Sequence, residues 1–553
     1  MKEVKKNPIL ENKIYLYLTE FFAGMSVMAV ELGASRLLAP YFSSSKIVWT
    51  IIIGTIMIAM ALGNIMGGRW ADKNPNPDKL YGRIIIAAIW IALIPVVGKY
   101  IVIGISALLV FTVSTNFLVV AAFAACMIIF VFPLFLLGTV TPSLVKYTVD
   151  SLDDSGKVVG YLNASNTIGS IIGTFVPTFI SIPAVGTSIT FLIFAGILML
   201  LAIIYFAYGK TRSVKAIVGV IIFLISCIFG HGDSFAFWEK DLTYEGESIY
   251  NYLQVYEDDN KVVLSTNVLF GVQSVYRKEK TLTGMYYDYA MAAPYMAGIK
   301  EKDEVKILVL GMGTGTYATQ CNRYFDNVSV EGVEIDQKIT DLAHEYFELP
   351  EEVKVTTYDG RAYLEALKAE KKNKVEDTTE EQAANSKYDV IMVDAYQDIT
   401  IPFQMSSVEF FELVKSQLKS DGVMVVNMNM KTDTEGGIND YLSDTISSVF
   451  DTVYTVDVTN NTNRELFASN NPDMVNRMAK GVELETDEDL KDMMDKVNNS
   501  LVKYEAGDLI LTDDKAPVEL LSMKAIDALI KDEVDYYKDV YEEEGIKGVL
   551  EDF

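Results

Sequence analysis

The residues best suited to chemistry in this chain are a run of glycines and three acids in its second half. The stretch "KILVLGMGTGTYATQ" (306–320) ends an apolar run with a glycine at every second position. Glu334 follows 19 residues after the last of these glycines, and Asp359 and Asp394 each end a further apolar run. A glycine turn lets a ligand approach the backbone, and an acid placed like Glu334 suits the two hydroxyl groups of a ribose. The predicted nucleoside-binding residues are Gly311, Gly313, Gly315, Glu334, Asp359 and Gly360.

The spacing of the glycines separates two classes of nucleoside ligand. A dinucleotide such as NAD would share the glycines and the ribose acid, but its usual pattern is G-x-G-x-x-G. Position 316 is Thr in this chain, and the glycines are spaced G-x-G-x-G. With acids after the second and third apolar runs, this pattern fits S-adenosylmethionine or a relative better than NAD.

The elements that must hold these residues are buried strands alternating with amphipathic helices. Between residues 301 and 530 the apolar runs include "VKILVLG", "VSVEGVEID", "VKVTTYDG", "YDVIMVDAY" and "GVMVVNMNM", and helical patterns separate them. This order predicts a doubly wound, mostly parallel Rossmann-like sheet, in which ligands bind at the carboxyl ends of the strands. Short alternating runs over 240–300 predict a small antiparallel β-sheet. Residues 368–387 predict a polar surface insertion, and residues 531–553 an acidic C-terminal tail.

Residues 1–230 predict a transmembrane helical domain of about seven spans. Apolar segments long enough to cross a bilayer lie near 15–38, 48–68, 84–110, 117–140, 160–182, 188–208 and 214–230. Pro95 and Lys99 interrupt the third segment, which predicts either a broken helix or a hairpin of two short crossings. Basic residues gather at the N-terminus and in the second, fourth and sixth loops, which favours a cytoplasmic N-terminus.

Charge and the rare residue types exclude several classes of function. Residues 1–230 hold 16 Lys and Arg against 9 Asp and Glu, whereas the remainder is strongly acidic, in a chain of net charge −27. An acidic soluble half argues against nucleic acid, because phosphate binding needs a basic face. Three cysteines and two histidines offer no zinc spacing, disulfide framework or ordinary Ser-His or Cys-His nucleophile. We therefore expect no metal and no prosthetic group.

The motifs of both halves resemble those of one known family. Residues from about 245 to 525 resemble the spermidine synthases (polyamine aminopropyltransferases) through "ESIYNYLQV", "VLGMGTGT", "VEGVEID", "YDGRAYL", "YDVIMVDAY", "IPFQMSSVEFF" and "LTDDKAPVELL". The first half is similar to the membrane-fused members through "ELGASRLLAPYF", "ALGNIMGGRWAD" and "GYLNASNTIGSIIGTF". The resemblance implies a small N-terminal β-sheet on a methyltransferase-like Rossmann domain, and it is compatible with a homodimer.

The resemblance also implies a reaction. Decarboxylated S-adenosylmethionine would give its aminopropyl group to a diamine, usually putrescine, which yields spermidine and methylthioadenosine. Asp394 is then the catalytic carboxylate that takes a proton from the attacking amine, and Tyr286 and Tyr287 would close the pocket over the sulfonium. Glu334 would hold the ribose, Asp359 the adenine amino group, and Asn251 a further part of the donor.

The chain departs from the soluble synthases where amines are held. Thr314 stands where their glycine turn carries an Asp that meets the aminopropyl amine. Their Tyr-His-Glu is here Tyr286-Tyr287-Asp288, and their second acid after the catalytic Asp is here Gln397, followed by Asp398. Each lost carboxylate removes a partner for a cationic amine. The predicted substrate-binding residues are Tyr287, Asp288, Gln397 and Asp398, with Asp513 and Asp514 as further acids that would restore the anchors.

Two other functions stay open on the sequence. One is an enzyme that uses S-adenosylmethionine itself, as a methyltransferase or a lyase, which Thr314 permits. The other is a polyamine transporter or sensor in the lipid bilayer whose Rossmann domain binds without turnover.

The location of the C-terminal domain raises a conflict. Because the donor is made inside the cell, we expect this domain in the cytoplasm. Seven crossings from a cytoplasmic N-terminus would instead place it outside. Two crossings within 84–110, or a reversed N-terminus, would remove the conflict.

Overall fold

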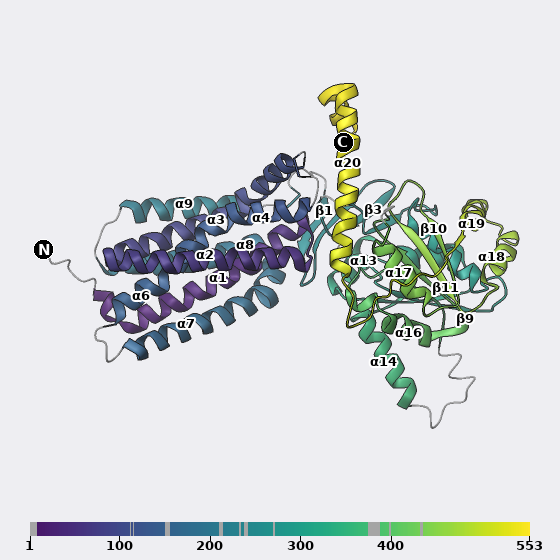
Figure 1. The fold of residues 1–553 in the computed structure, drawn as a ribbon, viewed down its shortest axis with the longest axis horizontal. Coiled ribbons are helices and arrows are strands. Elements are labelled where there is room, and N and C mark those ends of the chain that lie inside the picture. The colour runs from purple at the N-terminus through teal and green to yellow at the C-terminus, as the bar shows by residue number, and fades with distance from the viewer. Residues whose placement is uncertain are drawn as a thin grey trace. The chain divides into compact units, whose positions relative to one another are not determined.

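The computed structural model describes residues 8–552, except 111, 114–115, 150–154, 210–213, 232–233, 237–241, 269–270, 374–386, 397–399 and 432–434. The chain divides into two compact units, which are coloured by residue number in Figure 1. The first unit comprises Met1–Lys240, Glu245–Tyr252 and Asn267–Leu269. The second comprises Asp241–Tyr244, Leu253–Thr266 and Phe270–Phe553.

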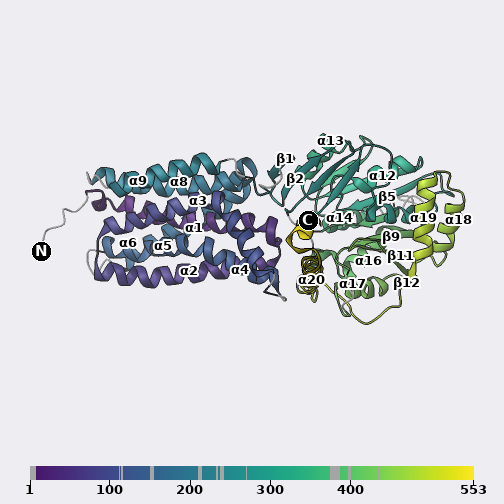
Figure 2. The ribbon, with the colours of Figure 1, turned by 90° about the horizontal axis from the view of Figure 1, so that it is seen from above.

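Apolar helices make up most of the first unit, and Figure 2 shows them side by side. They are α1 (Lys13–Phe42), α2 (Lys46–Lys73), α3 (Pro77–Leu109), α4 (Phe117–Ile129), α5 (Val131–Gly138), α6 (Val140–Thr148), α7 (Ser155–Val176), α8 (Ile182–Tyr208) and α9 (Val214–Gly230). Among the described residues, five helical stretches are long and apolar enough to cross a membrane. The longest, Ser155–Tyr208, is interrupted at Gly186, where φ is 81°. The seven predicted segments all fall on these helices, and the number of spans stays a prediction.

The third predicted segment is not a hairpin. α3 continues as one helix through Pro95 and Lys99. Side chains along it such as Ile91 are fully buried, so packing maintains the helix although proline removes one backbone hydrogen bond. The Lys99 ammonium donates to the Ser234 carbonyl oxygen at 3.1 Å, which gives this buried charge a partner. The hypothesis of two short crossings within 84–110 is therefore wrong.

Glycines let neighbouring helices of the first unit approach closely. A Cβ added at Gly63 in α2 would lie 2.3 Å from the Phe135 carbonyl oxygen in α5. A Cβ added at Gly169 in α7 would lie 2.0 Å from the Phe21 carbonyl oxygen in α1. Small residues spaced in this way are typical of helix packing in membranes, and they leave no room for larger side chains at these crossings.

Two sheets organise the remaining elements. The small sheet has the order β1-β2-β3-β4, formed by β1 (Leu242–Glu247), β2 (Tyr252–Glu257), β3 (Lys261–Ser265) and β4 (Ser274–Arg277). The large sheet has the order β12-β10-β11-β9-β8-β5-β6-β7. Its strands are β5 (Val305–Leu310), β6 (Val328–Glu334), β7 (Lys354–Thr357), β8 (Tyr388–Val393), β9 (Leu418–Met428), β10 (Thr452–Asp457), β11 (Arg464–Ser469) and β12 (Val502–Lys503). Strands β9, β8, β5, β6 and β7 are parallel, and β10, β11 and β12 pair antiparallel.

Helices follow the parallel strands, as expected for a Rossmann-like domain. They are α12 (Thr316–Tyr324), α13 (Gln337–Tyr346), α14 (Gly360–Asn373), α16 (Val408–Gln417) and α17 (Ile438–Ser447). Two short helices, α10 (Tyr286–Ala290) and α11 (Ala292–Met296), precede β5, and α18 (Met474–Glu483) and α19 (Glu488–Ser500) lie between β11 and β12. A single apolar cluster joins α10, α11, α12, α18 and α19 to the strands. The last described helix is α20 (Val518–Asp552), which includes residues 531–552 of the predicted acidic tail. Residues 374–386 of the predicted insertion lie outside the described residues.

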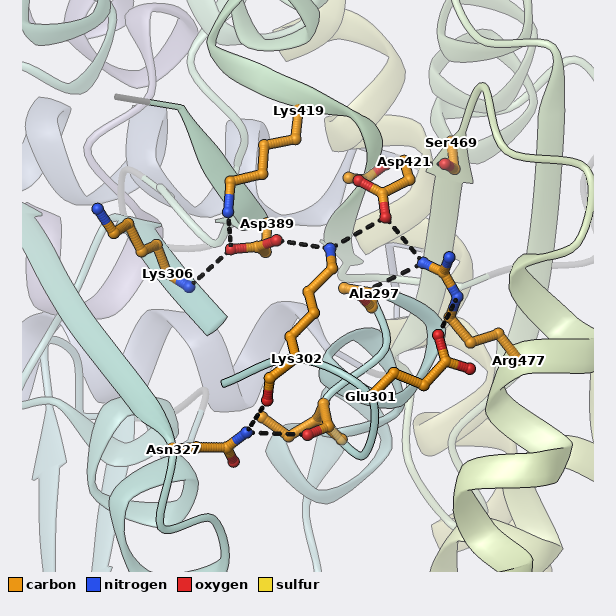
Figure 3. Close-up of polar contacts among 12 residues, drawn as sticks. Ala297, Glu301, Lys302, Lys306, Asn327, Asp389, Lys419, Asp421, Ser469 and Arg477 are labelled. Atoms are coloured by element: carbon orange, nitrogen blue, oxygen red, sulfur yellow. Dashed lines mark hydrogen bonds and ion pairs between the residues drawn. The ribbon is translucent and has the colours of Figure 1, made fainter. Parts of the chain in front are cut away.

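An ion-pair network fixes the edge of the large sheet where β5 and β8 begin (Figure 3). Asp389 of β8 is fully buried and accepts from the ammonium groups of Lys302 and Lys419, each at 2.7 Å. It also accepts from the Lys306 backbone N–H at 2.9 Å. Lys302 further pairs with Asp421 at 3.0 Å. Because these residues lie at the amino ends of the parallel strands, the network braces the edge opposite to their carboxyl ends.

Candidate active site

The glycine turn between β5 and α12 is tied to the end of β6. The Gly313 N–H donates to Oε2 of Glu334 at 2.8 Å, and the Asp336 N–H donates to Oε1 at 3.0 Å. Glu334 is the last residue of β6, and 6% of its surface is exposed. Gly313 has a φ of 56°, and a Cβ there would lie 2.7 Å from Oγ of Ser274. The predicted turn and the predicted ribose acid are therefore in direct contact.

Asp394 directly follows β8 and is held by two side chains. The Tyr286 hydroxyl donates to Oδ2 at 2.7 Å, and Nδ2 of Asn427 donates to Oδ1 at 2.9 Å. Tyr286 is the first residue of α10, and Asn427 lies near the end of β9. Two hydrogen bonds from different elements fix the orientation of the carboxylate, as a catalytic group requires.

Asp359 follows β7, and its Oδ1 accepts from the Ala362 N–H at 2.8 Å, which caps the start of α14. Gly360 is the first residue of that helix. Since β8, β5, β6 and β7 are consecutive parallel neighbours, their carboxyl ends carry Asp394, the glycine turn, Glu334 and Asp359 in succession. This is the edge of an open α/β sheet where ligands bind.

Burial raises the pKa of both central acids. The pKa of Asp394 is raised to about 7 by burial, which outweighs the hydrogen bonds from Asn427 and Tyr286. The pKa of Glu334 is also raised to about 7, because burial outweighs the N–H groups of Asp336 and Gly313. A carboxylate whose pKa lies near 7 is suited to accept a proton at neutral pH.

The residues predicted to hold the acceptor have other contacts. Oδ1 of Asp288 accepts from the Thr283 N–H and hydroxyl, and its Oδ2 accepts from the Gly284 N–H. The Tyr287 hydroxyl donates to the Gln273 carbonyl oxygen at 2.7 Å. These are the contacts of residues that shape a turn, and the assignment of both to the acceptor stays a prediction. Asn251 lies in the turn between β1 and β2, and Gln397 and Asp398 lie outside the described residues.

The structure also describes the two C-terminal acids that were predicted as further anchors. Asp513 accepts two hydrogen bonds from the Arg361 guanidinium, at 2.7 and 2.6 Å, and a third from the Ser407 hydroxyl. Its carboxylate is thus occupied within the protein, and Asp514 is exposed. Among the side chains that the structure describes, no group of three or more His, Cys, Asp or Glu is placed to hold a metal ion.

Three polar residues at the same edge were missed from the sequence. Asn427 holds Asp394, and Nδ2 of Asn463 donates to Oδ1 of Asn427 at 2.7 Å. Glu465 lies directly opposite Asn427 in the antiparallel pairing of β11 with β9. One feature of the sequence could have indicated Asn427, because this residue interrupts the apolar run "VMVVN" at a strand end. No sequence pattern could have indicated Asn463 or Glu465, because their positions depend on how β11 pairs with β9.

Known proteins match the part of the chain that carries this edge. The model of the spermine/spermidine synthase domain matches residues 289–463. A protein of Bifidobacterium longum (strain NCC 2705), described as a probable polyamine aminopropyl transferase, is 50% identical over 365 residues, which cover 63% of this chain and 77% of that protein. The polyamine aminopropyltransferase of Vibrio vulnificus (strain CMCP6) is 27% identical over 228 residues, which cover 40% of this chain and 69% of that protein.

A solved structure also aligns with this chain. It is that of a probable spermidine synthase from Corynebacterium glutamicum ATCC 13032, with 18% identity and a TM-score of 0.35, and the alignment covers 48% of this chain and 98% of that chain. The decisive likeness is the one to the Bifidobacterium protein, because half of the aligned residues are identical over most of that protein's length. The chain is a transferase that belongs to the spermine/spermidine synthase family, the polyamine aminopropyltransferases.

Proposed function

We propose that this chain is a membrane-bound aminopropyltransferase that moves an aminopropyl group from decarboxylated S-adenosylmethionine to a diamine such as putrescine. The observation that carries the proposal is the Asp394 carboxylate, held by Tyr286 and Asn427 beside the glycine turn. The family's donor is decarboxylated S-adenosylmethionine, and the sheet edge offers the groups that such a nucleoside needs.

The donor half of the site is supported by Glu334, Asp359 and the glycines. Both oxygens of Glu334 already accept one backbone N–H each, and each keeps a lone pair for a ribose hydroxyl. Asp359 uses Oδ1 as a helix cap, so its Oδ2 is the oxygen that we assign to the adenine amino group. The glycine turn would pass beneath the nucleoside, as the absence of side chains there permits.

The transfer requires a neutral amine and a departing thioether. The amine nitrogen forms a bond to the methylene next to the sulfonium, the carbon–sulfur bond breaks, and its electron pair neutralises the sulfur. The nitrogen then carries an extra proton, which Asp394 accepts. The products are spermidine and methylthioadenosine, and no oxidant or reductant is needed. Tyr286, bound to the same carboxylate, keeps it aimed at the amine.

Thr314 favours a second candidate, in which the donor is S-adenosylmethionine itself, used by a methyltransferase or a lyase. Its side chain is buried, and its hydroxyl has no hydrogen-bond partner among the described residues. A carboxylate at this position would attract the aminopropyl amine but repel the carboxylate of the intact donor. A neutral hydroxyl does neither, so the choice of donor must be measured.

The apolar helices support attachment to a membrane, with the catalytic unit assigned to the cytoplasm where the donor is made. Small-residue packing between α1 and α7 is typical of membrane helices. The alternative is a polyamine transporter or sensor, in which the catalytic unit binds the nucleoside without turnover and the helices serve transport or sensing.

The test is product analysis with the purified full chain in detergent. We expect decarboxylated S-adenosylmethionine and putrescine to give equal amounts of methylthioadenosine and spermidine by mass spectrometry. The Asp394→Asn variant serves as the inactive control. A methylated product formed from S-adenosylmethionine would establish the second candidate instead, and binding of methylthioadenosine without any product would establish the sensor.

A further inference from the structure

Glu465 is a buried acid in the active site that the transfer described above does not use. Its side chain has no exposed surface, and neither carboxylate oxygen has a hydrogen-bond partner among the described residues. Buried carboxylates in proteins are almost always paired or hydrogen-bonded. An acid with both oxygens unmatched therefore needs an explanation.

The position of Glu465 relates it to Asp394. Cross-strand partners point to the same face of a sheet, and Glu465 is the partner of Asn427, whose side chain holds Asp394. Asn427 donates through Nδ2 to Asp394 and accepts at Oδ1 from Asn463, and neither of these hydrogen bonds goes to Glu465. From β8 to β11 the two acids are separated by two strand spacings, about 10 Å between their backbones.

The electrostatics agree with this placement. Burial and then the charge of Asp394 raise the pKa of Glu465 well above its ordinary value, and no cation among the described residues lowers it. Arg464, the neighbour of Glu465 in the chain, pairs with Asp457 instead, as does Lys431. In the part of the chain that the structure describes, the two acids thus share one face of the sheet, and neither has an ion pair with a basic side chain.

We propose that Glu465 is a second cation subsite of the active site, which receives an ammonium group of the acceptor while Asp394 receives the attacking amine. The acceptor is then an unbranched di- or polyamine whose two nitrogens are separated by a flexible chain. This inference rests on the proposed function. It also explains how the chain dispenses with the acceptor acids that the soluble synthases carry, because Asp288 and Asp513 are occupied within the protein.

The test compares two acceptors of equal length, 1,4-diaminobutane and 1-aminobutane, in wild type and in Glu465→Gln. We expect the variant to raise KM for the diamine roughly 10–100-fold, the usual loss for one hydrogen bond to a charged group, and to leave KM for the monoamine within threefold or so. The preference for the diamine would thus disappear. Asp389→Asn is the matched control, because it removes another fully buried acid of the same sheet and should keep the preference.

The outcomes separate the two proposals. Wild type that forms no aminopropylated product with any amine would overturn the proposed function. Wild type that is active, with equal KM for both amines or with an unchanged preference in Glu465→Gln, would overturn only the role of Glu465. If Glu465→Gln does not fold, Glu465→Asp takes its place, because it keeps the charge but withdraws it by one methylene. The diamine KM should then rise while the monoamine KM stays constant, and an unchanged diamine KM would again reject the subsite.

Discussion

Gly311 lies against the backbone of Asp394, so the glycine turn and the proposed catalytic acid are fixed to each other. A Cβ added at Gly311 would lie 2.5 Å from the Asp394 carbonyl oxygen, and the φ of Gly311 is 82°. The Asp394 N–H donates to the Leu310 carbonyl oxygen at 2.9 Å, one residue before this glycine. The position of the glycine turn, where we propose that the nucleoside binds, is therefore fixed relative to Asp394 by backbone contacts between the ends of β5 and β8.

Gly311→Ala should disturb this relation. The added methyl group meets backbone rather than a flexible side chain, and a positive φ adds strain for alanine. We expect both methylthioadenosine affinity and turnover to fall at least tenfold or so. Calorimetry and a product assay check this, with Gly436→Ala as control, because Gly436 also has a positive φ but nothing lies within 4 Å of its added Cβ. Equal behaviour of the two variants would contradict the argument.

Asp394→Asn should separate chemistry from donor binding. Asparagine keeps the shape but cannot accept the proton, so we expect turnover to fall by roughly 10²–10⁴. Methylthioadenosine affinity should change only a few-fold, because the donor is held by other residues. An unchanged turnover would remove Asp394 from the mechanism.

The same variant predicts a stability difference that depends on pH. The pKa of Asp394 in the folded protein is raised to about 7, above the value of about 3.9 for an unfolded Asp. The stability that its proton contributes is therefore complete below about pH 4 and is lost as pH rises through 7. We expect Asp394→Asn to melt at a higher temperature than wild type at pH 8, with a smaller difference at pH 5. A difference that grows toward low pH would contradict the sign.

Glu334 predicts a pH dependence of donor binding. Its pKa is raised to about 7, and ribose hydroxyls donate to the ionised form. Methylthioadenosine affinity should accordingly rise with pH through 7 and level off above it. Glu334→Gln should lose about 1.5–3 kcal/mol of binding free energy at pH 8 and should no longer respond to pH. A variant that retains the wild-type pH profile would exclude Glu334 from the site.

The sequence alone located those residues of the candidate site whose position depends on the end of a single strand. Glu334 and Asp394 each terminate an apolar run, and parallel strands bring such ends to one edge. Asn427 could not be assigned in the same way, because the pairing of β8 with β9 shifts between Tyr388 and Val390. A shift of one residue reverses which side chains face the site, and nothing in the residues of β8 reveals it.

Contacts distant in sequence limited the other assignments. Asp513 looked like a free acid, but its partner Arg361 is 152 residues away. Lys99 looked like a reason for a turn, but the Ser234 carbonyl oxygen satisfies its charge within a continuous helix. In both cases the local sequence pattern is real, but contacts with residues distant in sequence determine the structure that it adopts.

Asp389→Asn should weaken the fold without changing the chemistry. The variant loses charge-assisted bonds to Lys302 and Lys419, which costs about 1–3 kcal/mol in the free energy of unfolding. Both lysines are partly exposed, so water compensates part of the loss. We expect a lower melting temperature with kcat/KM within about twofold of wild type. Loss of activity at full stability would show that this network also positions the site.

The contacts at the two ends of α1 bear on which side of the membrane holds the catalytic unit. At its N-terminal end the Tyr15 hydroxyl donates to the Leu201 carbonyl oxygen, and at its C-terminal end the Tyr41 hydroxyl donates to the Phe235 carbonyl oxygen. Phe235, which follows the last apolar helix α9, thus lies at the end of α1 opposite to Tyr15, an arrangement that agrees with the predicted odd number of crossings. Since the hairpin within 84–110 is excluded, the predicted seven crossings would combine a cytoplasmic catalytic unit with an N-terminus outside the cell.

Donor supply and loop charge thus favour opposite orientations, and we keep the cytoplasmic one because the positive-inside rule is a bias, whereas transfer without a donor is impossible. Two cysteine variants at exposed positions test it, Asn74→Cys between α2 and α3 and Glu488→Cys at the start of α19. A membrane-impermeant thiol reagent on intact cells should label Asn74→Cys at once and Glu488→Cys only after lysis. The unmodified chain is the control for its three native cysteines. The reverse pattern would place the catalytic unit outside the cell, where only an external donor would allow turnover.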